Sequence, residues 1–153
     1  MAVNTTAQLF SLDNSVFRAY LFYCSLLVLK MMFMSIYTAA TRMSKKAFAN
    51  PEDSAMYKMK PTTNDQVERV RRAHLNDLEN IPIFTVAAFV YLMTGPSAWL
   101  AQTLFLAFTA ARFAHTLVYA VVVVPQPARA LAFFVGYAIT AYMAIHGALH
   151  FMV

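Results

Sequence analysis

The sequence is poor in charged residues, in glycine and in cysteine. Of its 153 residues, 12% are charged, three are glycine and one is cysteine, whereas 60% are hydrophobic and the mean hydropathy is +0.53. A soluble domain of this length could not bury so much apolar surface, so the composition excludes an ordinary soluble domain and indicates a helical membrane protein. The single cysteine, Cys24, excludes an intrachain disulfide.

Basic residues are concentrated in one part of the chain. The formal net charge is +5, and eight of the twelve Lys and Arg residues lie between Arg42 and Arg72. The positive-inside rule therefore places the polar segment of about residues 43–67 in the cytosol. Nucleic-acid binding is not expected, because the aromatic residues lie in apolar runs. The first ten residues lack the basic start of a cleaved signal peptide, so the first apolar run is expected to remain as a span.

Apolar runs and breaks predict an all-α integral membrane protein, a four-transmembrane-helix bundle in a single domain of residues 1–153. The predicted spans are Val16–Thr41, Ile81–Met93, Ala98–Val124 and Ala130–Val153. The stretches GPS (95–97) and PQP (125–127) mark short turns, because Pro and Gly end helices. Four spans place both termini on the lumenal side, where Asn4 begins a glycosylation-type sequon.

The second apolar run is too short to cross a bilayer without help. It has only 13 residues and contains Pro82, so its helix must extend upstream to span about 30 Å. The residues thereby drawn to membrane depth are His74, Asn76, Asp77, Glu79 and Asn80. Each charge in the middle of a membrane costs on the order of 2.5 to 3.5 kcal/mol, so we expect these side chains to face inward rather than toward lipid.

Two faces of this charged helix are expected to have different roles. Helical spacing places one group on a single face: Glu68, Arg69, Arg72, Asn76 and Glu79. This row suits a zwitterionic ligand better than an ion-pair ladder within the helix, which would contribute only a few tenths of a kcal/mol, roughly. Asp77 lies on the other face and is the predicted counter-charge of Lys30 in the first span.

Further cations are predicted to gather at the cytosolic side. Arg112, His115 and Tyr119 share a face of the third helix at i, i+3 and i+7. Arg42 closes the first helix and Arg129 opens the fourth. Because Arg42, Arg72, Arg112 and Arg129 would repel one another at low dielectric, the pattern predicts an anionic ligand among them.

Four blocks of the sequence resemble a known family in their order along the chain. They read KKAFANPED, ERVRRAHLNDLENI, ARFAHTLVY and PQPARALAFFVGY, and they are similar to signature blocks of the membrane-associated proteins in eicosanoid and glutathione metabolism, the MAPEG family. The microsomal glutathione transferase branch is the most similar. This resemblance implies a homotrimer in the endoplasmic reticulum and outer mitochondrial membrane, with glutathione as co-substrate between subunits near the cytosolic face.

The same resemblance implies roles for individual residues and a reaction. Positions that match the glutathione-binding groups are Arg42, Arg72, Asn76, Glu79, Arg112, His115 and Tyr119. Arg129 matches the residue at the thiol, and Asp53 matches a carboxylate that assists it, so these two are the candidate catalytic residues. The implied reactions are conjugation of glutathione to hydrophobic electrophiles and glutathione-dependent reduction of lipid hydroperoxides. The implied partners are glutathione, these two kinds of substrate and membrane lipids, with no second cofactor.

Two other functions within the family remain open. The prostaglandin E synthase branch resembles this chain less, because it carries Arg, Ser and Tyr where this chain has Leu75, Ala130 and Phe133. A non-catalytic, lipid-binding member would be expected to lack the thiol-facing arginine, which is present here. His146 and His150 have the i, i+4 spacing of a metal pair, but no third ligand is near in the sequence, so no metal site is predicted.

Overall fold

The computed structural model describes residues 5–152, which are helical apart from turns and loops. Asn4, the first residue of the sequon, lies outside the described residues. The elements follow in the order α1 (Thr6–Leu9), α2 (Ser15–Ser44), α3 (Pro51–Met56), α4 (Asp65–Met93), α5 (Ala98–Thr116), η1 (Leu117–Val121) and α6 (Ala128–Phe151). The sequence patterns did not predict the short helices α1 and α3, nor the π-helical turn η1.

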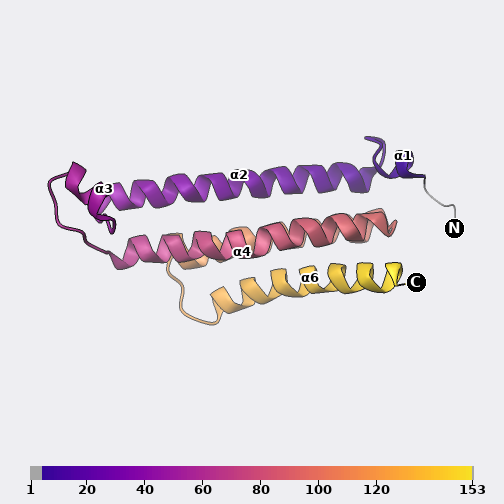
Figure 1. The fold of residues 1–153 in the computed structure, drawn as a ribbon. Helices are drawn as coiled ribbons and strands as arrows, with labels where there is room; N and C mark the ends of the chain where they lie inside the picture. Colours follow the sequence, from indigo (N-terminus) through magenta and orange to yellow (C-terminus); the bar gives the residue numbers. More distant parts are fainter. Residues whose placement is uncertain (1–4, 153) are drawn as a thin grey trace.

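The four long helices run antiparallel to their neighbours along the chain (Figure 1). The segment that contains α3 joins α2 to α4 at one end, whereas α1 and the last turn of α6 lie at the other end (Figure 1). Both α4 and α5 pack against α2 and α6. The two predicted turns are confirmed: GPS separates α4 from α5, and PQP precedes α6. This connectivity gives an up-down-up-down order of the long helices.

Asparagine side chains fix where two of the long helices begin. The Asn14 side chain accepts hydrogen bonds from the amides of Val16 and Phe17 at the start of α2. Asn64 does the same for the first turn of α4. The first amides of a helix have no partner within it, so such a cap contributes about 1 kcal/mol to helix stability.

Helix α4 is continuous through its proline. It has 29 residues and is therefore about 44 Å long. Pro82 lies inside it and removes one backbone hydrogen bond without ending the helix. The predicted upstream extension of this helix is confirmed, because α4 begins well before Ile81. The row of polar residues from Arg72 to Glu79 is consequently held on one rigid element.

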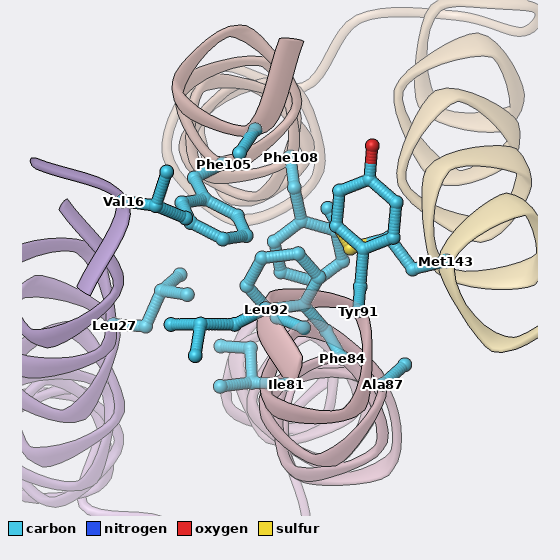
Figure 2. Close-up of a cluster of buried hydrophobic side chains, with 12 residues drawn as sticks. Val16, Leu27, Ile81, Phe84, Ala87, Tyr91, Leu92, Phe105, Phe108 and Met143 are labelled. Atoms are coloured by element: carbon cyan, nitrogen blue, oxygen red, sulfur yellow. The ribbon is translucent and has the colours of Figure 1, made fainter. Parts of the chain in front are cut away.

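The apolar core lies between α2, α4, α5 and α6 (Figure 2). Phe84 of α4 and Phe108 of α5 stack with their ring centroids 3.6 Å apart and their planes 4° from parallel. Leu27 approaches this pair from α2, and Met143 does so from α6 (Figure 2). These buried side chains fix the position of α4 relative to α5 and α6.

Within residues 5–152, three helices are long and apolar enough to cross a membrane. They are α2, the combined stretch Ala98–Val121, and α6. Large apolar side chains cover their outer faces, as at Phe33, Leu106 and Leu131, each more than half exposed in the single chain. Helix α4 is equally long but more polar, so the fourth span remains a prediction.

Candidate functional site

A polar hollow opens between α4, the η1 turn and the start of α6. Its volume is about 360 Å³. The residues that line it are Arg72, Leu75, Asn76, Glu79, His115, Tyr119, Gln126, Arg129, Ala130, Phe133 and Phe134. Six of the nine residues that the sequence nominated meet here, although they come from α4, α5, η1 and α6 and from positions up to 57 apart, between Arg72 and Arg129.

Helix α4 contributes one wall of the polar hollow. Arg72, Asn76 and Glu79 follow at i, i+4 and i+7, so they lie on one face of this helix. Arg72 and Glu79 are exposed in the single chain, and Asn76 is partly buried. The expectation that the polar residues at membrane depth face inward is confirmed for Asp77, which is buried. It is wrong for Glu79, which borders an open hollow on the side of the single chain.

The first turn of α6 places a guanidinium at the other wall. The Cζ atom of Arg129 lies 4.4 Å from the ring centroid of Tyr119, which is cation–π geometry. The Gln126 amide lies beside the same group: with its oxygen turned toward Arg129, it accepts hydrogen bonds from Nε at 3.3 Å and Nη2 at 2.8 Å. Arg129 is thus oriented from two sides at a helix N-terminus, where the helix dipole favours an anion.

Tyr119 owes its position to the π-helical turn η1. Single π-turns within helices are rare and occur frequently at functional sites. The Tyr119 hydroxyl accepts a hydrogen bond from Nε of Arg72 at 3.3 Å, and its ring packs edge-on against His115 at 5.7 Å. Tyr119 therefore connects the arginine of α4 to the arginine of α6 across the hollow.

A buried ionic network lies behind the hollow. Asp77 is fully buried and forms salt bridges with Lys30 and with Arg112, whose Nη2 lies 2.6 Å from Oδ1 of Asp77. Lys30 also donates a hydrogen bond to Oγ1 of Thr116 at 2.7 Å. The predicted pairing of Lys30 with Asp77 is confirmed. The network ties α2, α4 and α5 together at the level of the hollow.

Arg112 belongs to this network and does not line the polar hollow. It is 1% exposed, and Asp77 neutralises it. Its Nη2 also donates to Oδ1 of Asn76 at 2.8 Å, so it positions a residue that does line the hollow. The prediction of an anionic ligand among Arg42, Arg72, Arg112 and Arg129 did not count Asp77 as a counter-charge. Of these four arginines, only Arg72 and Arg129 line the hollow.

His115 carries an unsatisfied polar atom at the edge of the hollow. It is 3% exposed, and its Nδ1 atom has no hydrogen-bond partner among residues 5–152. A buried ring nitrogen without a partner is uncommon in folded proteins. This unpartnered nitrogen belongs to a residue that lines the polar hollow.

Two nominated residues lie outside the hollow of a single chain. Arg42 is in the last turn of α2, and Asp53 is on α3, where Oδ2 accepts a hydrogen bond from Asn50 at 3.2 Å. Glu68 faces Arg71, which donates hydrogen bonds at 2.9 and 2.8 Å and lowers the pKa of the Glu68 carboxyl. The ion pair within this helix therefore uses Arg71 and leaves Arg72 to the hollow.

Sequence reasoning missed two lining residues, Gln126 and Phe134. Gln126 lies between two prolines in the PQP turn, which had been assigned only a turn-forming role. The hollow is also lined by the three residues that depart from the prostaglandin E synthase branch, Leu75, Ala130 and Phe133. The hollow of this chain therefore differs in shape and polarity from the one that the prostaglandin E synthase residues would form.

Comparisons with known proteins agree with the sequence blocks. The family model described as "MAPEG family" matches residues 20–149. Microsomal glutathione S-transferase 1 of Bos taurus is 48% identical over 139 residues, covering 87% of this chain and 89% of the relative. The Homo sapiens protein of that name is 46% identical over the same lengths. Prostaglandin E synthase of Bos taurus is 41% identical over 110 residues, covering 71% of this chain and 72% of the relative. The chain belongs to the MAPEG family.

Proposed function

We propose that this protein is a microsomal glutathione transferase. It conjugates glutathione to hydrophobic electrophiles and also reduces lipid hydroperoxides with glutathione. The observation that carries the proposal is the meeting of arginine, amide, carboxylate and histidine side chains in one hollow on a helix bundle with apolar outer faces. The 48% identity to a glutathione transferase supports it. Each subunit is one four-span domain of the endoplasmic reticulum or outer mitochondrial membrane, with its loop of about residues 43–67 in the cytosol.

The chemistry of the lining fits glutathione. Glutathione carries two carboxylates, one ammonium group and a thiol. Arg72 is suited to a carboxylate, because guanidinium groups bind carboxylates through paired hydrogen bonds. Glu79 is suited to the ammonium group. Asn76 and Nδ1 of His115 supply hydrogen-bonding atoms for the peptide groups of glutathione.

Arg129 is the proposed thiolate-stabilising residue. A free thiol has a pKa near 8.5, so only a few per cent, roughly, is ionised at neutral pH. A neighbouring cation lowers such a pKa by about one to three units, and the N-terminal end of α6 adds to this effect. Tyr119 and Gln126 hold the guanidinium in place, so it needs little reorganisation to donate hydrogen bonds to sulfur.

Both proposed reactions use the same thiolate. In conjugation, sulfur bonds to the electrophilic carbon while a halide leaves, or it adds to an activated double bond whose other carbon takes a proton. In peroxide reduction, two glutathiones become one disulfide, while the hydroperoxide becomes an alcohol and water. The protein itself undergoes no net oxidation in either reaction.

The exposed wall of α4 favours assembly with further copies. Arg72 and Glu79 would meet lipid if the chain were alone at that depth, and a charge there costs about 2.5 to 3.5 kcal/mol. A neighbouring subunit in the homotrimer would cover this wall. In that arrangement Arg42 and Asp53, which lie outside the hollow of their own chain, are proposed to complete a hollow shared between subunits.

A prostaglandin E synthase-like isomerase is the second candidate function. The 41% identity to such an enzyme favours it. Against it, three residues of the hollow are Leu75, Ala130 and Phe133, where that branch carries Arg, Ser and Tyr. The loss of these polar groups removes hydrogen bonds for a polar substrate and favours apolar electrophiles.

Parallel assays of the purified protein in lipid nanodiscs separate these functions. Glutathione is supplied with a chlorodinitroarene, a lipid hydroperoxide or prostaglandin H. The proposal predicts turnover of the first two, and turnover of prostaglandin H alone would support the isomerase. Activity with none of them, together with tight lipid binding, would favour a non-catalytic member of the family.

Two variants test the assigned roles. Arg129→Ala is expected to lower turnover at neutral pH by on the order of tenfold or more, because the pKa of the bound thiol rises. Arg129→Lys, which keeps the charge, serves as its control. Glu79→Ala is expected to weaken glutathione binding more than it lowers turnover. An unchanged ultraviolet absorbance of the bound thiolate in Arg129→Ala would remove the role assigned to this arginine.

A further inference from the structure

The segment between α2 and α4 folds into a compact unit of its own. Phe48 and Tyr57 stack with their ring centroids 4.6 Å apart and their planes 11° from parallel. The amide of Thr62 donates to the Phe48 carbonyl at 2.8 Å, and the amide of Met59 donates to the Ser54 carbonyl at 3.0 Å. These contacts close the segment on itself, so its surface is preformed.

This unit contains a second hollow, which we call the lysine hollow. Its volume is about 230 Å³, and Met43, Lys46, Phe48, Tyr57 and Met59 line it. Three of these side chains are exposed although they are largely apolar: Met43 by 60%, Tyr57 by 49% and Met59 by 37%. The lining therefore combines one ammonium group with a mostly apolar surface, which is the chemistry of an amphiphile-binding site.

Four exposed lysines lie in the segment that forms the lysine hollow; one of them lines it, and the other three are next to lining residues in the sequence. They are Lys45, Lys46, Lys58 and Lys60, and none of them forms an ion pair within residues 5–152. Lys46 and Lys58 have positive φ angles of 48° and 53°, at the points where the chain leaves α2 and α3. The acids of the segment, Glu52 and Asp53, are in the first turn of α3 and do not line the hollow. These lysines are consequently cations without an ion-pair partner in the described part of the chain.

The length of α2 places this unit at the depth of lipid headgroups. With 30 residues, α2 is about 45 Å long. A bilayer is about 40–45 Å thick when its headgroup regions are included, so the end of α2 lies in the headgroup layer. Met43 is in the last turn of α2. The segment that contains α3 and forms the rest of the lysine hollow follows α2 directly (Figure 1). Lysines at this depth attract anionic lipids, and exposed Met and Tyr side chains contact the outer ends of acyl chains.

We propose that the lysine hollow binds an anionic phospholipid of the cytosolic leaflet. The lysines contact the phosphate and any acidic headgroup, and the Met and Tyr side chains contact the glycerol and the upper acyl chains. The site is separate from the polar hollow, shares none of its lining residues and does not depend on the proposed catalysis.

A fluorescent reporter inside the lysine hollow tests this proposal. The only tryptophan of the chain, Trp99, is replaced by Phe, and Tyr57→Trp then places a single indole against Phe48. The protein is reconstituted in phosphatidylcholine nanodiscs that contain equal fractions of either brominated phosphatidylserine or brominated phosphatidylcholine. Stronger quenching by the brominated phosphatidylserine is expected.

Substitutions distinguish a built site from general surface charge. Lys46→Gln is expected to lower the preference for the anionic lipid by up to about fivefold, the usual attraction of one lysine to an anionic leaflet. Replacing all four lysines with Gln should abolish the preference. Arg71→Gln is the matched control: it removes an exposed cation of α4 that is paired with Glu68 and does not line the lysine hollow, so it should leave the preference unchanged.

Three results would overturn the proposal. Equal quenching by the two brominated lipids would show that there is no preference for an anionic lipid. Absence of quenching would show that the hollow faces water or a protein. Full competition by soluble glycerophosphoserine would show that the hollow binds a free anion without its acyl chains.

Discussion

Replacing Asp77 with asparagine is expected to destabilise the protein strongly. The Asp77 carboxylate is fully buried and neutralises two cations, Lys30 and Arg112. Asparagine has nearly the same shape, so the substitution removes the charge and creates little cavity. Both cations then stay buried without a counter-charge, the situation in which breaking a buried ion pair is most costly.

The magnitude follows from the contacts. Oδ1 of Asp77 accepts hydrogen bonds from Nε and Nη2 of Arg112 at 3.1 and 2.6 Å, and its other oxygen pairs with Lys30. Removing one partner of a buried pair costs about 3 to 5 kcal/mol. For a chain of this size, each kcal/mol lowers the unfolding temperature by about 2 to 4 °C, so a decrease on the order of 10 °C is expected.

The assay is thermal unfolding of the purified protein in lipid nanodiscs, followed by far-ultraviolet circular dichroism. Lys30→Met is the control, because it leaves Asp77 and Arg112 as a balanced pair and is expected to have a small effect. The double variant Lys30→Met/Asp77→Asn should be more stable than Asp77→Asn alone, since only one buried cation remains. Equal unfolding temperatures for Asp77→Asn and the unmodified protein would refute the ionic network as a source of stability.

Three further predictions concern packing and the polar hollow. Gly147→Ala places a Cβ 2.5 Å from Cγ1 of Val90 and is expected to lower the free energy of unfolding, measured by denaturant titration, by about 1–3 kcal/mol. In Gly136→Ala the new Cβ meets its neighbours at 3.5 Å or more, so the same titration should show almost no change. Phe108→Ala removes one ring of the central stack and should cost about 3–5 kcal/mol by that measurement; a loss below about 1 kcal/mol would contradict the packing argument. Tyr119→Leu removes the ring beside the guanidinium of α6 and should lower turnover with the chlorodinitroarene more than Tyr119→Phe, and equal turnover of the two variants would contradict the proposed role of the ring.

The pairing of Lys30 with Asp77 could be predicted from the sequence, because both residues fall at membrane depth. A lysine in an apolar run needs a counter-charge, and few acids fall at membrane depth. The second cation on Asp77 was not predictable. Helical spacing placed Arg112 with His115 and Tyr119, but spacing alone does not give the rotation of α5 relative to α4, and that rotation turns Arg112 toward Asp77.

The position of the polar hollow could also be predicted only in part from the sequence. The i, i+4, i+7 row on α4 follows from helix periodicity, and so does the nomination of Arg72, Asn76 and Glu79. The side of the bundle on which this row lies depends on how α4 packs against α2 and α6. The π-turn that carries Tyr119 and the approach of Gln126 to Arg129 depend on contacts between helices, so the local sequence gave no signal for them.

The sequence alone determined the helical class, the two short turns and the family. Apolar run lengths, prolines and local signature blocks are properties of neighbouring residues and can be read directly from the chain. Only the tertiary structure decided which arginines line the hollow, which one is neutralised behind it, and where the lysine hollow forms. Those outcomes depend on the rotation and packing of whole helices, which are set by contacts between residues far apart in the sequence.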